Sequence, residues 1–265
     1  MKHNQVLFAL LFCLLTTFSA QAGVVILNGL SHIHQVNLGE NYRGSIQIRN
    51  SGNADQDVKL YLRDYRFHHN GDAFYDEPNY HERSNTDWIT LTPTLVTLKP
   101  YEERTIFYEI NVPAEVKLDG TFWSVIMVEG IKDLGKTASG GVSINTQVRY
   151  AVQVATNMGE TGTRELEFIG AEIKKLPDAT KRLFVNVENK GERLLQPTMQ
   201  VEIFDEGGNS VGQFTADRRK VYPETSTRFF VNLPQLPIGK YQALLLADCS
   251  DEDVFGINVE LSVDE

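Results

Sequence analysis

Between Phe67 and Arg83 the sequence concentrates side chains that commonly bind metal ions or carry protons. Histidines and carboxylates stand close together there, among them His68, His69, Asp72, Asp76, Glu77 and His81. Imidazole and carboxylate groups are suitable metal donors, but this spacing matches no zinc motif and no calcium-binding loop. Because Gly, Pro and Asn interrupt it, the stretch also fits a solvated surface loop. A third interpretation is a partner contact through Phe74, Tyr75 and Tyr80.

Motifs for covalent or phosphate chemistry are missing from the sequence. It contains no GxSxG, HExxH, Walker loop or GxGxxG pattern, the arrangements that usually mark nucleophilic, zinc-dependent or nucleotide-dependent catalysis. Cys249 stands among Asp248, Asp251, Glu252 and Asp253, and nearby negative charge raises a thiol pKa, which opposes reactivity. We therefore expect a protein that is not an enzyme and that uses no cofactor and no catalytic metal.

The first 22 residues are typical of an export signal. A basic start precedes an apolar run from Val6 to Leu15, and residues 20–22 form a small-x-small cleavage sequence. The apolar run is shorter than the roughly 20 residues that a membrane-spanning helix needs. We expect cleavage after Ala22 and an exported product that does not span the membrane.

Charge and cysteine content limit the classes of partner and the means of stabilisation. The chain has 25 Lys and Arg against 35 Asp and Glu, a net charge of −10. Nucleic acids and anionic lipid surfaces are poor partners for such a chain, since binding them requires clustered cations. Only Cys249 remains after cleavage of the signal, so the core must be held by burial without an intramolecular disulfide.

Strand patterns dominate the rest of the sequence. Alternating or β-rich runs such as Ser45–Arg49, Val58–Leu62 and Thr105–Ile110 are separated by Gly, Asn, Asp and Pro clusters. No window of a dozen residues has convincing helical periodicity. Many short strands at regular spacing predict a β-sandwich or barrel.

The two halves of the chain repeat the same order of features. A strand that ends in an Asn-x-Gly turn at Asn50 is matched by another at Asn189, and each is followed by Pro, Arg, a strand, Pro and Gly. Such internal repetition favours two copies of one sandwich over a single large barrel. We predict an all-β protein with a signal peptide at 1–22 and tandem domains at 23–158 and 159–265.

Residues 140–156 form an alternating run of unusual length. Apolar residues share one parity and mostly polar residues share the other, which is the periodicity of an extended chain. Strands usually run about 5 to 6 residues, so part of this run is in excess of what one sandwich needs.

The order of residues in the first half resembles the periplasmic pilus-assembly chaperones. The likeness is carried by Ile46–Gly52, by Trp88–Pro93, by Leu95 and by Leu98–Pro100 before a strand. An exported start and two immunoglobulin-like repeats agree with it. Tyr101 stands where the family usually has glycine, and the second half resembles the family only in general layout.

The resemblance implies a function for the excess strand. Such chaperones lend part of the last strand of their first domain to an incomplete pilin subunit, in the manner of β-augmentation. It therefore implies a periplasmic chaperone that binds and caps pilus or surface-fibre subunits through strand 140–150, with an outer-membrane usher as a further partner. The donor side chains would be Val142 and Ile144, with Val148 continuing that face into the chaperone's own body.

The resemblance also implies a basic anchor for the carboxylate at the subunit's C-terminus. Arg149 holds that position, and a guanidinium can bind a carboxylate through two charge-assisted bonds. The alternative is an exposed strand arginine that pairs with a neighbouring carboxylate. The family's second anchor falls near His34, because Gly23–Val36 contains no Lys or Arg; His34 would serve when protonated or is an ordinary strand histidine.

Two other functions compete with the chaperone. One is a non-catalytic envelope adhesion or scaffold module that binds protein or glycan through the 67–84 loop. The other is an enzyme or metal carrier that uses the histidines of the same loop.

Overall fold

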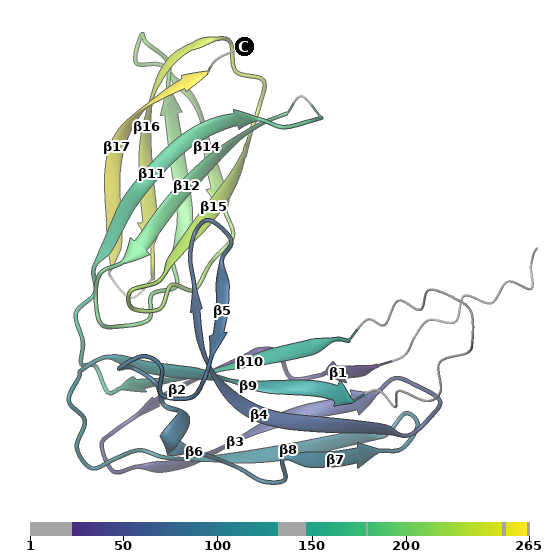
Figure 1. The fold of residues 1–265 in the computed structure, drawn as a ribbon. Coiled ribbons are helices and arrows are strands. Elements are labelled where there is room, and N and C mark those ends of the chain that lie inside the picture. The colour runs from purple at the N-terminus through teal and green to yellow at the C-terminus, as the bar shows by residue number, and fades with distance from the viewer. Residues whose placement is uncertain (1–22, 132–146, 179, 251–252, 264–265) are drawn as a thin grey trace, which may run out of the picture.

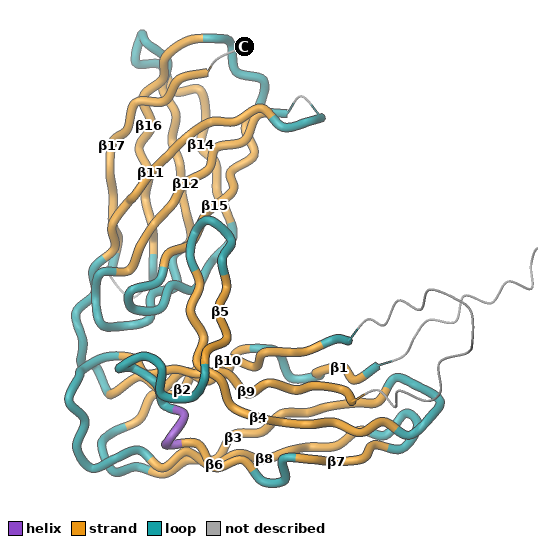
Figure 2. The backbone as a smooth tube through the Cα atoms, viewed as in Figure 1, coloured by secondary structure: helices purple, strands orange, loops and turns teal. Residues whose placement is uncertain are grey.

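The chain folds into two β-sandwiches arranged like the two arms of an L (Figure 1). The computed structural model describes residues 23–131, 147–178, 180–250 and 253–263, and the predicted signal peptide lies outside them. Within these ranges the elements are strands apart from one short 3-10 helix (Figure 2). The prediction of an all-β protein with tandem sandwiches is confirmed.

The first sandwich is built from the strands before residue 159. They are β1 (Val24–Ile26), β2 (Ser31–Val36), β3 (Asn41–Asn50), β4 (Gln56–Phe67), β5 (Ala73–Asp76), β6 (Ile89–Leu91), β7 (Leu95–Leu98), β8 (Glu103–Asn111), β9 (Thr121–Ile131) and β10 (Arg149–Met158), with the 3-10 helix η1 (Thr86–Trp88) before β6. One sheet has the order β1-β3-β8-β6, and the other has the order β2-β10-β9-β4-β5, with β7 also paired to β4.

The second sandwich contains the remaining strands. They are β11 (Leu166–Lys175), β12 (Lys181–Asn189), β13 (Thr198–Phe204), β14 (Ser210–Ala216), β15 (Ser226–Leu233), β16 (Gly239–Asp248) and β17 (Val254–Val263). Its sheets have the orders β11-β12-β15 and β14-β13-β16-β17. In this half the first, second and fifth strands form one sheet, and the third, fourth, sixth and seventh form the other, which is an immunoglobulin-like arrangement.

Alternation along the strands builds a separate core in each sandwich. In β3, Ile46 and Ile48 are buried while the residues between them are exposed. Leu183 and Val185 repeat this pattern in β12. The buried residues of the two halves form distinct clusters, so each sandwich is stabilised mainly by its own apolar face.

The junction between the sandwiches is tight because glycine brings two backbones together. Gly120, just before β9, has a φ of 90°, a region that side-chain-bearing residues rarely adopt. A Cβ at this position would lie 2.0 Å from the carbonyl oxygen of Glu192 in the second sandwich. Next to it, the Thr121 amide donates to that same carbonyl at 2.8 Å.

An arginine holds the linker that leaves β10. Arg193 is buried and donates to the carbonyl oxygens of Gly159 at 2.7 Å and Thr161 at 3.0 Å. The second sandwich therefore forms hydrogen bonds with both the linker and the start of β9. These hydrogen bonds join the two arms of the L at a shared corner.

We predict that Gly120→Ala destabilises the protein by about 2 to 4 kcal/mol, because the methyl group meets a backbone carbonyl that cannot move aside. The measurement is a denaturant titration followed by tryptophan fluorescence. Gly39→Ala is the matched control, since Gly39 has a φ of 75° but its Cβ would meet only Ala114 Cα at 3.9 Å. Its expected cost is about 1 kcal/mol. Equal losses in the two variants would contradict a steric role for Gly120.

Candidate functional site

Strand β10 has an edge that is only partly covered. It pairs with β9 along its whole length, from Arg149 opposite Glu129 onward. On its other side the parallel strand β2 begins to pair only at Gln153, which lies opposite Ser31. Among the described residues, Arg149–Val152 therefore have a β partner on one side and none on the other.

The backbone groups on this open edge belong to alternate residues. The amides of Gln153 and Gly159 donate toward the β2 side, to Leu30 at 2.9 Å and Val36 at 2.7 Å, whereas the Met158 amide donates toward β9, to Gly120 at 2.9 Å. Odd-numbered residues thus face β2 and even-numbered residues face β9. By this alternation Arg149 and Ala151 direct their N–H and C=O groups to the open edge.

The edge is open because the N-terminal segment changes sheets. Strand β1 pairs with β3 in the opposite sheet, and β2 then joins β10. The crossing is fixed by Asn28, whose amide donates to the Ser45 carbonyl at 2.8 Å and whose oxygen accepts from the Gln47 amide at 2.9 Å. Gly29 follows with a φ of 85°. Consequently the segment reaches β10 only at Ser31.

The predicted donor residues lie at and beyond the start of β10. Val142 and Ile144 lie outside the described residues. Val148 is described, and 55% of its surface is exposed. It shares the parity of Tyr150 and Val152, which pack against the first core, so its side chain lies on the line of that core at the margin of the domain.

Arg149 lies on the outer face of this sheet, the face that looks toward the second sandwich. Its Nε lies 3.2 Å from Glu129 Oε2, and the two side chains are 54% and 16% exposed. The ion pair of the alternative interpretation is therefore present. From Arg149 to Gln153, whose side chain contacts Tyr222 of the second sandwich, the strand runs about 13 Å, so the guanidinium lies away from the corner.

His34 lies on the opposite face, between the two sheets of the first sandwich. Its ring lies 4.4 Å from that of Tyr42, and Nε2 is 3.4 Å from the Tyr108 hydroxyl. Burial lowers the pKa of His34, and the neighbouring His32 lowers it further. The sequence suggested that Arg149 and His34 could hold one carboxylate, but the strand turns them to opposite faces. The geometry of His34 is that of an ordinary strand histidine.

An aromatic stack that the sequence did not reveal joins the two sandwiches. Trp123 of β9 lies between His81, with ring centroids 4.4 Å apart, and Tyr222 of the second sandwich, at 4.9 Å. The Tyr222 hydroxyl reaches across to Gln153 Oε1 at 3.0 Å. Trp123 and Tyr222 belong to different domains, so no local pattern connects them.

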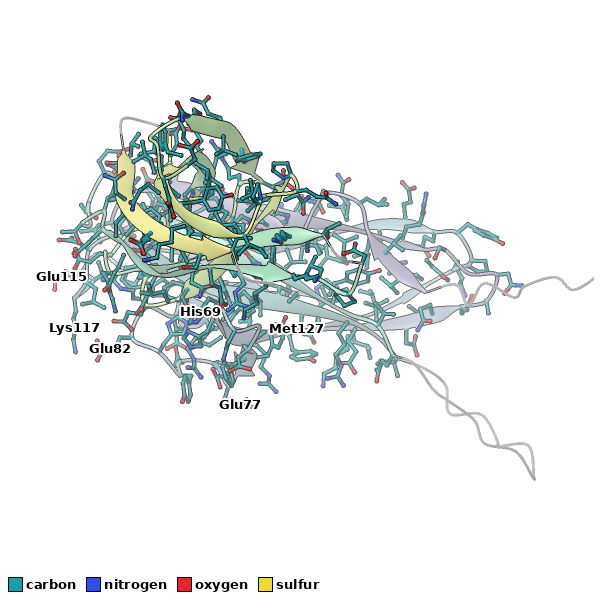
Figure 3. All side chains as sticks on the ribbon, turned by 90° about the horizontal axis from the view of Figure 1, so that it is seen from above. His69, Glu77, Glu82, Glu115, Lys117 and Met127 are labelled. Atoms are coloured by element: carbon teal, nitrogen blue, oxygen red, sulfur yellow. The ribbon has the colours of Figure 1, made fainter. Side chains whose placement is uncertain are left out.

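The segment after β4 contacts the corner near both of its ends, while most of residues 70–80 between them are exposed to solvent. Strands β4 and β5 form a hairpin that rises beside the second sandwich (Figure 1). Near its tip the His69 amide donates to Ser226 Oγ at 3.0 Å; Figure 3 labels His69. Fully buried Asp64 accepts from the amides of Tyr80 at 2.7 Å and His81 at 3.1 Å, which folds the following residues against the sheet.

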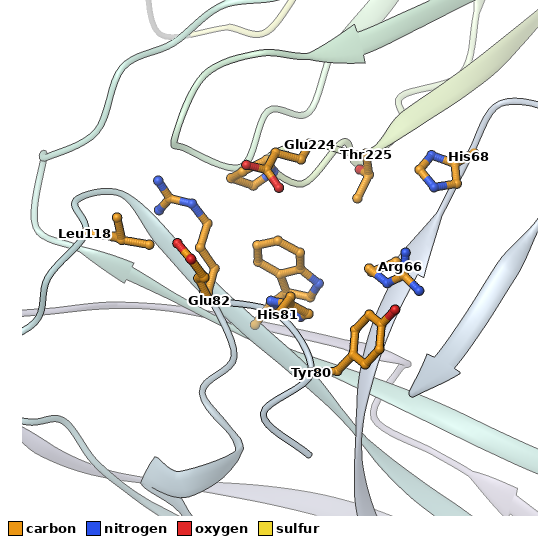
Figure 4. A pocket seen from close by; sticks show the side chains of 11 residues that line it. Arg66, His68, Tyr80, His81, Glu82, Leu118, Glu224 and Thr225 are labelled. Carbon is orange, nitrogen blue, oxygen red and sulfur yellow. The ribbon is translucent and has the colours of Figure 1, made fainter. Parts of the chain in front are cut away.

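A pocket of about 500 Å³ opens where this segment meets the second sandwich. Arg66, His81 and Glu224 are among the side chains that line it (Figure 4). Burial lowers the pKa of His81, although Asp64 opposes that change. Over the part of the chain that the structure describes, no three His, Cys, Asp or Glu side chains gather as a metal site would require.

Two further findings bear on the class of protein. Burial raises the pKa of Cys249 to about 11, so its thiol is a poor nucleophile at neutral pH. Of the residues searched, which are those that the structure describes, none form a helix long and apolar enough to cross a membrane.

No protein-family model and no curated protein matches the chain. Similar solved structures include a chain of a chaperone–tip adhesin complex of CFA/I fimbriae biogenesis, with 12% identity, 91% and 99% of the two chains covered and a TM-score of 0.47. The YadV chaperone is 12% identical to this chain, with 90% of this chain and 100% of that chain covered and a TM-score of 0.45. A third similar structure is a chain of the CsuC–CsuE chaperone–tip adhesion subunit pre-assembly complex of Acinetobacter baumannii. It is 11% identical to this chain, with 93% of this chain and 100% of that chain covered and a TM-score of 0.44.

The chain is thus similar in overall structure to fimbrial chaperones, the class of protein that its sequence resembles.

We predict that stability falls as the pH drops below 6.5. Burial lowers the pKa of His32 and His34 from 6.5 in the folded protein, so the unfolded chain binds more protons below that pH and unfolding is favoured. Their contribution is complete above pH 6.5 and is lost as the pH falls through the lowered pKa values of the folded protein. Unfolding free energies measured across this range should fall less steeply in a His32→Gln, His34→Gln double variant. An unchanged slope would exclude these two residues as its source.

Proposed function

We propose that this chain is a periplasmic chaperone for pilus or surface-fibre subunits and that it holds its client by strand addition to β10. The observation that carries the proposal is the open edge at Arg149–Val152. A strand edge with unpaired N–H and C=O groups is a ready template for another chain. The sequence resemblance and the export signal agree with this function and with a periplasmic location.

The geometry suggests how a client strand would be held. Backbone bonds to Arg149 and Ala151 would supply the pairing, while side chains of the other parity would face the client's apolar groove. Val148 is exposed on that parity. The proposal extends this face to Val142 and Ile144, which lie outside the described residues. An outer-membrane usher is proposed as the second partner on the resemblance alone.

The carboxylate anchor is assigned to Arg149 without His34. Its guanidinium is half exposed on the face toward the second sandwich, and its partner Glu129 also accepts from the Tyr61 hydroxyl at 2.8 Å and from Gln147 Nε2 at 2.6 Å. Glu129 therefore keeps donors if Arg149 turns to a client carboxylate. That exchange has a low energetic cost, because exposed ion pairs are worth at most about 1 kcal/mol.

Ala151→Pro tests the strand edge. Proline removes the N–H that points to the open side but leaves the even-numbered bonds to β9, so stability should fall by less than about 2 kcal/mol while client binding is lost. The measurement is co-purification after co-expression with the secreted proteins encoded beside this gene, with identification by mass spectrometry.

Ala151→Ser is the matched control for the proline variant, because it keeps the N–H and should bind like the wild type. If Ala151→Pro also retains its client, strand addition at this edge is excluded.

Arg149→Ala should reduce client recovery at least tenfold, the expected effect of losing a charge-assisted anchor. Its stability should change by less than about 1 kcal/mol. Arg49→Ala is the matched control, since Arg49 is another exposed strand arginine, 3.6 Å from Glu103 on a neighbouring strand. Recovery that is the same for Arg149→Ala and Arg49→Ala would show that Arg149 is not the anchor.

An adhesion or scaffold module that binds through residues 67–84 is the second candidate. Phe74, Tyr75 and Tyr80 are exposed on that segment, which favours a protein or glycan contact. A ligand held there would remain bound to Ala151→Pro and would be lost in a Tyr75→Ala, Tyr80→Ala variant, the reverse of the chaperone result.

A further inference from the structure

The outer face of sheet β11-β12-β15 carries arginines gathered around two phenylalanines. Phe184 and Phe230 pack edge to face with centroids 5.4 Å apart. The guanidinium carbon of Arg228 lies 5.5 Å from the Phe184 ring, and those of Arg182 and Arg219 lie 5.9 Å and 5.2 Å from the Phe230 ring. At these distances the cation–π attraction favours each guanidinium near a ring while leaving its N–H groups available to an acceptor.

These arginines have neutral hydrogen-bond partners where other cations of the domain have carboxylates. Arg182 donates to Asn232 Oδ1 at 2.9 Å and Arg228 to Asn186 Oδ1 at 2.7 Å. By contrast, Lys174 of the same sheet lies 2.7 Å from Glu172. Within the described ranges no carboxylate lies within ion-pair distance of Arg182, Arg219 or Arg228. In a chain of net charge −10, a group of cations without ion-pair partners is unexpected and indicates a binding surface.

The group continues into a pocket of about 420 Å³ at the corner of the L. Its lining comprises Tyr65, Phe67, Gln153, Gln196, Arg218, Arg219, Lys220 and Thr227. Among these lining residues there are three cations and no carboxylate. Burial lowers the pKa of Lys220, as expected where an ammonium group loses water without gaining an anion.

The position of the pocket relates it to the open edge of β10. Gln153 lines the pocket and is the first residue of β10 that pairs with β2, so the pocket begins where the open edge of Arg149–Val152 ends. Arg219 belongs both to the pocket and to the arginine group above it. We call the set of Arg182, Arg218, Arg219, Lys220 and Arg228 the cationic wall; within it Arg218 also donates to Ser250 Oγ at 2.6 Å.

We propose that the cationic wall binds carboxylate groups on an acidic segment of the protein that β10 holds. This inference rests on the proposed function, because it takes one strand of the client to end at Arg149 and a different, acidic segment of the same client to lie against the corner beside Gln153. Guanidinium groups match carboxylates geometrically, and the exposed Phe230 suits contact with a protein.

Synthetic peptides test the cationic wall without knowledge of the client. One peptide has six alternating Val and Thr residues, a Gly, and four Glu; its partner has four Gln in place of the Glu, and a third is eight Glu alone. At about 0.05 M salt we expect the Glu-ended peptide to bind at least tenfold more tightly than the Gln-ended one, and this difference should vanish near about 0.5 M salt.

The triple variant Arg182→Gln, Arg219→Gln, Arg228→Gln should abolish the preference for Glu. Lys240→Gln is the matched control, since Lys240 lies on the other sheet of the same sandwich, 3.2 Å from Glu260, and it should keep the full preference. Thermal unfolding checks that the variants are folded. If the triple variant is unstable, Arg219→Gln alone should still reduce the preference severalfold, because Arg219 is exposed.

The outcomes separate this inference from the strand-addition proposal. If strand addition is wrong, Ala151→Pro binds both Val-Thr peptides as the wild type does, while eight Glu alone still distinguishes the wild type from the triple variant. If the cationic wall is wrong, the wild type binds Glu-ended and Gln-ended peptides equally. Tighter binding of a short DNA duplex than of eight Glu would also overturn it, by showing a site for phosphates.

Discussion

The stacking of Trp123 between His81 and Tyr222 is the contact on which the rest of the arrangement depends. The three rings lie within 5 Å of their neighbours and are largely withdrawn from water. Two aromatic pairs of this kind contribute about 1 to 3 kcal/mol beyond the burial of their surface. Because Trp123 belongs to β9 and Tyr222 to the second sandwich, the stack sets the direction in which the second arm leaves the first.

Buried polar groups make that contact specific. Asp64 is fully buried. Its carboxylate is stabilised there because three donors reach its oxygens, namely the Tyr80 amide, the His81 amide and the Ser84 hydroxyl. An unpaired buried carboxylate would be strongly destabilising. The hydrogen bonds fix the course of residues 80–84 and thereby press the His81 ring onto Trp123. A polar network in the first sandwich thus positions one side of the aromatic stack.

Much of the fold could be predicted from the sequence because its causes are local. Alternation in Ser45–Arg49 and the repeated turns at Asn50 and Asn189 indicate strands, tandem sandwiches and their approximate limits, and the strands lie where these patterns indicate. Burial on one face of a strand leaves a period of two in the chain, and that period can be read without coordinates.

The site depended on register and on contacts across domains, which local patterns do not contain. Arg149 could be placed on a strand, but its pairing with Glu129 follows from the β9 register. The face of His34 follows from a parallel pairing with β10 that the sequence does not specify. His81 looked like part of a metal-donor cluster because its neighbours in sequence are polar, whereas its ring in fact lies on Trp123.

The crossing at Asn28 and Gly29 determines how much of the β10 edge stays unpaired. Strand β2 runs parallel to β10, so the residue at which it arrives determines how many positions of β10 remain vacant, and in the described part of the strand these are Arg149 to Val152. Lengthening or shortening the crossing by two residues would change that vacancy by two positions while keeping every side chain on its present face. Related chains could therefore adjust the length of this unpaired edge through this short segment, with no change to the cores.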